Sequence, residues 1–381
     1  MQTRPKFFVA AVATVLALVA CETETAEDAP ETPAPTDSSP ADKAGAAQST
    51  VDGKADWGFD LCEKRGWYGD AECDWFCPKP DPDCDLAPLG PEPAGSPTRH
   101  PIVLGHGFDA SPTNRWGFYK VAQTLGADGH AVHVAEVPPY DAVEIRAAYL
   151  ARHIDAALAE TGADKVNLVS HSMGGLDARY VVSVLGYADR VASVTTLSTP
   201  HRGSAVADVA LGLMPGPLDA VVNALASAWG RSYSDVANDS HVRAAMEAIS
   251  EEGTAAFNLE VKDASGVKYL SWAGVSSVLG LANTKDQAAC GKLLRHPGTS
   301  DRVHATLLPM APFTAHGTRL LPNDGMVTVE SAKWGEFQGC FPADHLDEVG
   351  QPRHDGPDAH TGFDHLRFYR NLAFDLAARG F

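Results

Sequence analysis

The stretch KVNLVSHSMGGLDARYV, residues 165–181, decides the fold class of this chain. It opens with a short apolar, β-branched run typical of a buried strand and closes with apolar residues at helical spacing. Between the two stands Ser172, with the small residues Ser170 and Gly174 two positions to either side, so the backbone can turn sharply. Ser170 stands where Gly is usual, a departure that still fits sterically. A chance match at a helix start is the alternative; the neighbouring segments favour a nucleophilic serine.

Short strand-like runs alternate with helical patterns from His100 onward. Such alternation is typical of a mainly parallel sheet with helices on both faces. Together with the turn at Ser172 it predicts an α/β-hydrolase fold over residues 100–381. The expected strands are 101–104, 131–137, 166–169, 191–197 and 267–273, and the expected helices are 115–127, 143–160, 174–185 and 363–378.

A second segment, HPIVLGHGF at 100–108, supports the nucleophile. It is a strand followed by His-Gly-Phe, where this fold supplies a backbone donor for the oxyanion. We assign the oxyanion hole to the N–H groups of Phe108 and Met173, and each such donor is worth roughly 10² to 10³ in rate. His106 precedes the nucleophile, so we expect it to brace the loop rather than to transfer protons.

The amino terminus indicates export. Residues 1–20 combine early positive charge with an apolar run of signal length, and Cys21 follows Leu-Val-Ala as in a lipoprotein processing box. The alternative is an ordinary cleaved signal with a chance Cys. Residues 21–56 are acidic and rich in Pro and Ala, with too few large apolar side chains to repay chain ordering, so we expect a disordered tether.

Six cysteines remain when Cys21 is set aside, an even number that suits an oxidising compartment. Four of them lie in residues 57–86, a small module that we expect to be stapled by disulfides. Zinc is the competing interpretation, and the pairing stays open; these four are Cys62, Cys73, Cys77 and Cys84. A Pro-rich linker follows at 87–99. The remaining two cysteines, Cys290 and Cys340, lie far downstream. If the four cysteines of the module pair only with one another, Cys290 pairs with Cys340.

The 381 residues carry a formal net charge of -19. This charge disfavours electrostatic binding to nucleic acid or to an anionic membrane surface, because phosphate contacts need clustered Lys and Arg. We therefore expect no nucleic-acid partner.

The acid and the base of a serine hydrolase of this fold follow the nucleophile in that order. Asp324 stands past an apolar run in the turn PNDG, although a turn Asp usually caps only its own backbone. Four histidines follow it, so chain order alone leaves four candidates for the base: His345, His354, His360 and His365.

Several motifs in the same order resemble the bacterial true lipases of the Pseudomonas and Burkholderia type. They are HPIVLGHGF, DGHAVHVAEVPP, KVNLVSHSMGGLDARYV, STPHRGSAVAD, YLSWAGVS, NDGMV and HLDEVGQ, and the likeness covers most of 100–355. The resemblance implies a triad of Ser172, Asp324 and His345. The other three histidines are then surface or bracing residues.

The resemblance also implies a structural Ca²⁺ near the catalytic His. Its ligands would be the carboxylates of Asp301 and Asp347 and the backbone carbonyl of Gln351, hard oxygen donors that suit calcium. The alternative is that Asp347 forms a salt bridge with a surface Arg. Asp344 and Glu348, in the same stretch, receive no chemistry.

A Cys290–Cys340 bond would tie the segment that bears the acid to the one that bears the base. Cys340 does not stand where the family's second Cys usually does, so two free thiols are the alternative.

Residues 206–256 contain apolar positions that could line one face of helical turns broken by Pro215 and Pro217. The resemblance implies a movable lid here, and a cap packed permanently on the core is the alternative. These apolar positions are Leu211, Leu213, Met214, Leu218, Val221, Val222, Leu225 and Trp229.

The combined expectation is an exported triacylglycerol lipase, lipid-anchored in the outer membrane or at the cell surface, otherwise secreted. A short-chain carboxylesterase and a bacterial polyester depolymerase are the alternatives within the class, and a non-catalytic adhesin is the alternative outside it. Expected partners are an ester lipid, a membrane through the anchor and a folding chaperone of the kind that many relatives need. No organic cofactor is expected.

Overall fold

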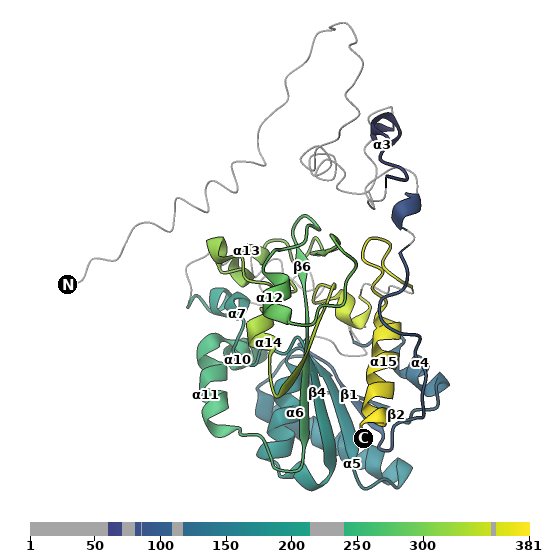
Figure 1. Ribbon diagram of the computed structural model, residues 1–381. Coiled ribbons are helices and arrows are strands. Elements are labelled where there is room, and N and C mark those ends of the chain that lie inside the picture. The colour runs from purple at the N-terminus through teal and green to yellow at the C-terminus, as the bar shows by residue number, and fades with distance from the viewer. Residues whose placement is uncertain (1–59, 71–80, 85, 109–116, 214–239, 352–355) are drawn as a thin grey trace, which may run out of the picture. The chain divides into compact units, whose positions relative to one another are not determined.

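The computed structural model describes residues 60–70, 81–84, 86–108, 117–213, 240–351 and 356–381. Its core is a six-stranded sheet in the order β2-β1-β3-β4-β5-β8, with every neighbouring pair parallel (Figure 1). Such a sheet is covered on both faces, so its central strands β1, β3 and β4 are buried along their whole length. The strands are β1 Ile102–Gly105, β2 Val132–Ala135, β3 Val166–His171, β4 Val191–Leu197, β5 Lys268–Gly274 and β8 Glu336–Phe341.

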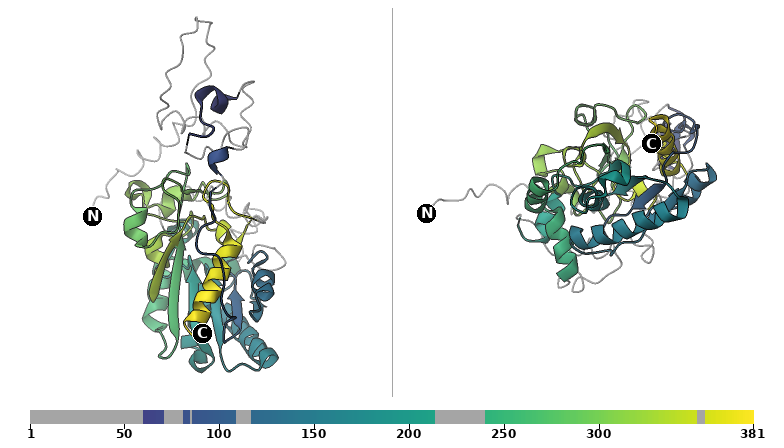
Figure 2. Two further views of the ribbon diagram at one scale, coloured as in Figure 1. Left: turned by 45° about the vertical axis from the view of Figure 1, so that its right-hand side comes forward. Right: turned by 90° about the horizontal axis from the view of Figure 1, so that it is seen from below.

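Two helices cover each face of the sheet (Figure 2). On one side α5 (Val143–Thr161) and α6 (Gly174–Ser183) pack together; on the other α4 (Val121–Ala127) packs against α15 (His365–Ala378). Successive strand residues point to opposite faces, so Val103 joins the core under α5 and α6. Its neighbours in β1 join the core under α4 and α15 instead. The predicted three-layer arrangement is confirmed.

One expected helix differs from the structure, and one strand was not expected. The helix expected over 115–127 begins only at Val121: residues 117–120 form a bend and turn, and Lys120 has a φ of 57°, which a right-handed helix cannot continue. Residues 109–116 lie outside the described part. The sequence analysis missed β8, an edge strand that contains a Gly and is only partly buried, so its pattern is weak.

Two long insertions lie beyond the carboxyl ends of the strands. The first, between β4 and β5, contains α7 (Ala205–Ala210), α10 (Ser240–Ile249) and α11 (Glu251–Glu260). The second, between β5 and β8, consists of short elements: β6 Ser276–Ser277, α12 Asp286–Cys290, β7 Asp301–Arg302, α13 Ala311–Thr314, η3 Gly317–Arg319 and α14 Val329–Ala332.

About half of the lid predicted at 206–256 lies outside the described residues, which omit 214–239. Of its apolar positions Leu211 is half-buried and Leu213 is exposed, while the other six belong to the omitted stretch. The lid therefore stays a prediction.

The structure confirms the disulfide between Cys290 and Cys340, whose Cα atoms lie 5.4 Å apart. Cys290 ends α12 and Cys340 stands in β8. Backbone hydrogen bonds of 2.8 Å join the Cys340 carbonyl to the Leu294 N–H and the Cys340 N–H to the Lys292 carbonyl. The bond thus fastens the second insertion to the edge of the sheet.

In the Cys-rich segment the short helix α3 (Leu61–Arg65) is capped by the Asp60 side chain, and Cys62 is disulfide-bonded. Residues 82–84 form the turn η1. The signal, Cys21, the tether, Cys73 and Cys77 lie outside the described residues. Among the helices that are described, none has the length and hydropathy to span a bilayer.

Candidate active site

Ser172 stands on the turn between β3 and α6 with a φ of 53°. This left-handed conformation costs a non-Gly residue of order 1 to 3 kcal/mol and persists only where the surroundings impose it. Here the Ser172 N–H donates to the Leu197 carbonyl at 2.9 Å, and the Ser172 carbonyl accepts from the Gly175 N–H at 3.0 Å and the Thr199 hydroxyl at 2.7 Å. The side chain is therefore presented at the carboxyl end of the sheet.

The departure from Gly at position 170 has a steric explanation. Ser170 pairs with Gly105 in the neighbouring strand, and a Cβ added to Gly105 would lie 2.7 Å from the Ser170 Oγ. A Cβ on Gly174 would similarly lie 2.6 Å from the Gly105 and His106 carbonyl oxygens. The Ser170 hydroxyl therefore fits at this turn because Gly105, its neighbour in β1, has no side chain.

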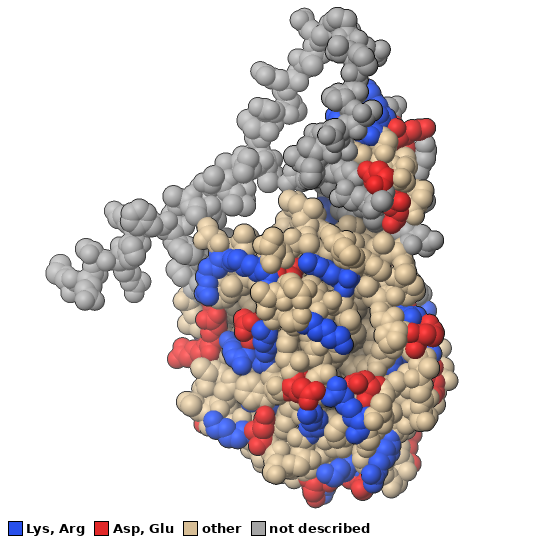
Figure 3. Space-filling view, in the orientation of Figure 1, with Lys and Arg blue, Asp and Glu red and all other residues tan. Residues whose placement is uncertain are grey.

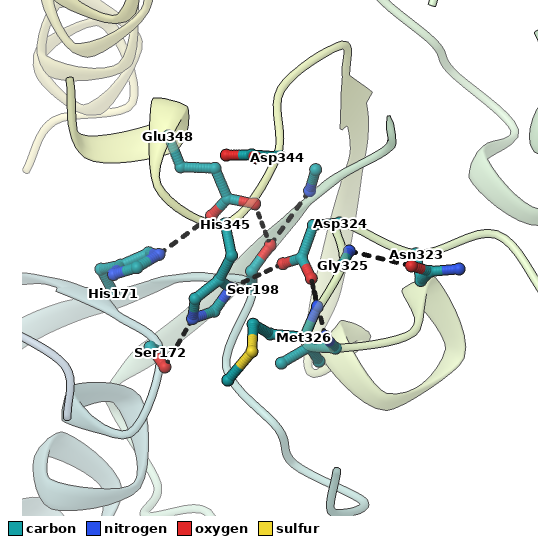
Figure 4. A network of polar contacts seen from close by, with 12 residues as sticks. His171, Ser172, Ser198, Asn323, Asp324, Gly325, Met326, Asp344, His345 and Glu348 are labelled. Carbon is teal, nitrogen blue, oxygen red and sulfur yellow. Dashed lines mark hydrogen bonds and ion pairs between the residues drawn. The ribbon is translucent and has the colours of Figure 1, made fainter. Parts of the chain in front are cut away.

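The three residues of the predicted triad meet in the structure (Figure 4). The His345 Nε2 lies 2.9 Å from the Ser172 Oγ, and the His345 Nδ1 lies 2.7 Å from the Asp324 Oδ2. Asp324 is fully buried, while Ser172 and His345 are 7% and 7% exposed. The arrangement has the geometry of a serine nucleophile, a base and a carboxylate that orients the base.

Asp324 both shapes its own turn and faces His345. Its Oδ1 accepts from the Met326 N–H at 2.8 Å and the Val327 N–H at 2.6 Å, and its backbone carbonyl accepts from the His345 N–H at 2.9 Å. Burial alone would raise the pKa of Asp324, but His345 and these backbone donors together lower it below its ordinary value. The carboxylate is therefore ionised and fixed beside the imidazole.

The loop that carries Phe108 is braced by Arg146, a fully buried residue that the sequence analysis did not single out. Its guanidinium donates to the His106 carbonyl at 2.9 Å and to the Gly107 carbonyl at 3.3 Å, and its Nε donates to Asp177 at 2.9 Å. The one sequence signal for this role is an arginine within a predicted helix, with an acidic residue in the next predicted helix to pair with it.

His106 completes the brace. The Val137 N–H can only donate, so the His106 Nε2, 3.2 Å away, accepts, and the proton resides on Nδ1, 2.9 Å from the Gly107 carbonyl. Burial lowers the pKa of His106 to about 3, with Arg146 adding to the effect. Because the peptide is planar and trans, holding the Gly107 carbonyl also fixes the direction of the Phe108 N–H.

Glu348 lies beside the triad, although the sequence analysis gave it no chemistry. It is fully buried, accepts from the Ser198 hydroxyl at 2.5 Å and lies 3.2 Å from the His171 Nε2 (Figure 4). The His171 ring in turn packs against His345, with centroids 4.5 Å apart. Burial, with Asp324 adding to it, raises the pKa of Glu348 well above its ordinary value. Glu348 thus supports the wall behind the proposed base.

The predicted calcium residues Asp301 and Asp347 lie together with Asp344, with carboxylate oxygens within 4.8 Å of one another. Burial and then the neighbouring Asp347 and Asp344 raise the pKa of Asp301 well above its ordinary value. Among the described residues the Asp301 Oδ2 has no hydrogen-bond partner. This buried, like-charged group fits a hard divalent cation.

Asp344, left without a role by the sequence analysis, orders the loop of His345. Its Oδ1 accepts from the Leu346 and Asp347 N–H groups at 2.8 and 3.0 Å, and its Oδ2 accepts from the His304 N–H at 2.6 Å. Both oxygens are thereby occupied, so Asp301 and Asp347 are the better candidates for metal ligands.

The remaining predicted residues lie around this loop. Gln351 is buried, and its side chain donates to the Gly117 carbonyl at 2.9 Å. The His365 ring lies 2.9 Å from the Tyr119 carbonyl and the His360 ring 3.4 Å from the Gly280 carbonyl, so neither meets Ser172. His354 lies outside the described residues.

A largely apolar cavity opens at Ser172 and His345. Met173, whose N–H is the second predicted oxyanion donor, begins the turn into α6 and is buried. Phe108 lines the cavity mouth. Side chains from both insertions form the walls, among them Val206, Met246, Ile249, Leu307, Met310 and Met326.

Comparison with known proteins identifies the family to which this fold belongs. The family described as alpha/beta hydrolase fold matches residues 100–245. A triacylglycerol lipase of Vibrio cholerae is 31% identical over 277 residues, covering 66% of this chain and 80% of the relative. One of Pseudomonas fragi is also 31% identical, over 66% of this chain and 88% of the relative.

Solved structures agree with the fold. EstA from Clostridium botulinum superposes with a TM-score of 0.51 at 19% identity, covering 77% of this chain and 92% of that one. A metagenomic carboxyl esterase superposes with a TM-score of 0.54 at 17% identity, covering 76% and 79%.

The chain is thus an α/β-hydrolase, as its parallel sheet and its sharp turn at Ser172 indicate. It belongs to the bacterial triacylglycerol lipase family and is an ester hydrolase.

Changing Arg146 to Lys should lower kcat by about 10- to 100-fold while KM changes little, because a misdirected oxyanion donor weakens only the transition state. Lysine keeps the charge beside Asp177 but cannot hold two carbonyls at once. Steady-state kinetics on a soluble ester checks this, with a melting curve for each protein. A lower melting temperature with kcat unchanged would reduce Arg146 to a structural role.

Proposed function

We propose that this chain is an exported triacylglycerol lipase that works through an acyl-enzyme on Ser172. The observation that carries the proposal is the continuous contact from Ser172 through His345 to the buried Asp324, at the opening of an apolar cavity. A non-catalytic adhesin is set aside, because the chain belongs to a family of ester hydrolases and keeps all three side chains in contact.

Acylation follows from the geometry. The Ser172 Oγ attacks the ester carbonyl as the His345 Nε2 takes its proton, and the carbonyl electrons move to the oxygen. Asp324 holds the His345 tautomer and stabilises the imidazolium, while the N–H groups of Phe108 and Met173 stabilise the oxyanion. The tetrahedral intermediate collapses, and His345 gives its proton to the departing alcohol.

Deacylation repeats these steps with water. The His345 Nε2 takes a proton from water as the water oxygen attacks the acyl carbonyl, and the proton then returns to the Ser172 Oγ when the Ser172–acyl bond breaks. The products are a fatty acid and regenerated Ser172. No redox change occurs at any step.

The cavity walls favour an apolar acyl chain over a small polar one. The side chains that line the cavity beyond Ser172 are mostly aliphatic or methionine, which is flexible and fills irregular space around a chain. Short-chain carboxylesterase and polyester depolymerase activities use the same three side chains, so cavity shape and surface binding separate them.

Replacing Ser172 by Ala should abolish ester hydrolysis without loss of folding, because no backbone contact of the turn depends on the hydroxyl. Hydrolysis of triacylglycerols of increasing chain length, above and below their solubility, is the measurement. Ser170→Ala, two residues away, is the matched control and should stay active. Retained activity of Ser172→Ala would contradict the assignment of Ser172 as the nucleophile. No gain in rate on emulsified esters would contradict the lipase assignment.

The same reasoning supports a structural calcium ion held by Asp301 and Asp347, with the Gln351 carbonyl as a third ligand. Burial raises the pKa of both Asp301 and Asp347 well above its ordinary value, and neighbouring carboxylates add to the effect, so an added positive charge is favoured here. The ion would contribute electrostatic neutralisation and hold the loop of His345 in place. It takes no part in the proton transfers.

Calcium should therefore raise the melting temperature. When free Ca²⁺ is about one hundred times Kd, the free energy of unfolding should rise by about 2.7 kcal/mol. Asp301→Asn should lose this response and, in EDTA, be no less stable than the parent, since it removes like-charge repulsion. Asp155→Asn, whose carboxylate pairs with Arg190 on the surface, is the control. Scanning fluorimetry in EDTA and in Ca²⁺ decides; equal melting temperatures of the parent protein in both would overturn the calcium site.

Export and anchoring rest on residues 1–21, where the apolar run ends at Cys21. We propose that Cys21 is lipid-modified and tethers the enzyme to the outer membrane or cell surface. Metabolic labelling with a radioactive fatty acid should mark the parent protein and leave Cys21→Ala unlabelled. Equal labelling of the two would refute the anchor.

A further inference from the structure

Four apolar side chains project from two loops of the second insertion, at the carboxyl end of the sheet where Ser172 lies. They are Val278, Leu279, Leu281 and Leu320, with 46%, 37%, 55% and 59% of their surface exposed. The Asn283 side chain donates to the Leu320 carbonyl at 3.1 Å, and the Lys285 ammonium donates to the Arg319 carbonyl at 2.5 Å. These contacts join the two loops, so we treat these four residues with Lys285 and Arg319 as one surface, the apolar-basic patch.

The backbone at Leu320 is strained, although its side chain is exposed. Leu320 has a φ of 45° and His316 a φ of 51°, both in the left-handed region that disfavours residues with a Cβ. Burial normally offsets such strain, but Leu320 is the most exposed apolar residue of the patch. The hydrogen bonds from Asn283 and Lys285 hold the loop in this form. Strain kept at an exposed apolar tip indicates a contact made outside the chain.

The charge of this segment is opposite in sign to that of the whole chain. Residues 276–323 contain two acidic residues, Asp286 and Asp301, and both are buried. Their basic residues are Lys285, Lys292, Arg295, Arg302 and Arg319. Among the described residues, no carboxylate lies within ion-pair distance of Lys285 or Arg319. Figure 3 shows Lys and Arg side chains over the region where Figure 1 places α12 and α13.

The net charge of -19 disfavours electrostatic adsorption of the whole chain to an anionic surface. Whether a single face adsorbs depends on how the charges are distributed over the surface. Residues 1–99 hold 18 of the 49 acidic residues. Apolar side chains flanked by Lys and Arg are the combination that adsorbs to lipid carrying negative charge.

The same insertion also lines the cavity through Leu307 and Met310 and leads into Asp324. A surface held by the patch therefore lies at the end of the molecule where the ester must enter. The reaction itself makes such a surface anionic, because each turnover releases a fatty acid.

We propose that the apolar-basic patch docks on an ester-lipid surface charged by fatty-acid carboxylates. The apolar side chains enter the acyl region while Lys285 and Arg319 meet the carboxylates. Adsorption then strengthens as hydrolysis proceeds. This inference rests on the proposed action on ester lipids, although docking needs no catalysis.

The test measures docking in full-length protein that carries Ser172→Ala and Cys21→Ala, so that neither hydrolysis nor a lipid anchor contributes. Phosphatidylcholine vesicles with and without oleate are sedimented with the protein. Oleate should raise the bound fraction, and Leu320→Asp or Arg319→Glu should lower the partition coefficient by about tenfold. High salt should weaken binding of the parent and leave that of Arg319→Glu almost unchanged.

Two matched controls carry the same chemical changes elsewhere. Leu259→Asp alters a side chain of α11 that is 77% exposed, and Lys165→Glu alters a charge next to the amino end of β3, away from the carboxyl ends of the strands. Both should bind like the parent. Equal binding of the patch variants and the controls, or binding that ignores oleate, would overturn the proposal. So would a dimer in sedimentation that Arg319→Glu abolishes, because the patch would then bind a second copy.

Activity separates this proposal from the preceding one. In the chain with Ser172 intact, Leu320→Asp should keep full activity on a soluble short-chain ester and lose about tenfold on an emulsion that contains oleate. Vesicle binding without activity on any emulsion would remove the lipase assignment and leave the patch. Emulsion activity that Leu320→Asp does not change would remove the patch and leave the lipase.

Discussion

The left-handed backbone at Ser172 is the constraint on which the rest of the site depends. A serine at a φ of 53° is unfavourable by itself, so its surroundings must hold it there. They do so through backbone hydrogen bonds to β4, the Thr199 hydroxyl and the close approach of β1 to the start of α6. That approach is possible only where no Cβ intervenes. The turn in return places the Ser172 hydroxyl at the one edge of the sheet that both insertions cover.

Buried polar groups form a second layer behind the three side chains of the proposed triad. Arg146 holds the oxyanion loop, Asp344 orders the backbone that follows His345, and Glu348 joins Ser198, the residue after β4, to the wall behind the imidazole. Each would be costly if unpaired, since an isolated charge in the interior loses its hydration. Their pairing therefore fixes the positions of the reacting groups as well as stabilising the fold. Asp301 and Asp347 are the exception in this layer. Their carboxylates lie close together and carry charge of the same sign.

Sequence alone predicted the parallel sheet, the turn at Ser172 and the Cys290–Cys340 bond, because each depends on local pattern or on residue type. The partners of Ser172 needed the family resemblance, since chain order left four histidines open. Arg146 was not singled out, and Asp344 and Glu348 received no chemistry, for a different reason: their importance comes from burial and from contacts across distant elements, which no local pattern records. The edge strand β8 was missed because its first three residues are not fully buried and one of its residues is a glycine.

The contact between Gly105 and Ser170 limits how this turn can change over evolution. The Gly105 position has no room for a side chain while Ser170 keeps its hydroxyl, whereas a glycine at position 170 would free that space. A lineage can therefore exchange the two residues in one order only: position 170 must shrink before position 105 can grow. The two positions are sterically coupled, so they should vary together whenever either departs from glycine.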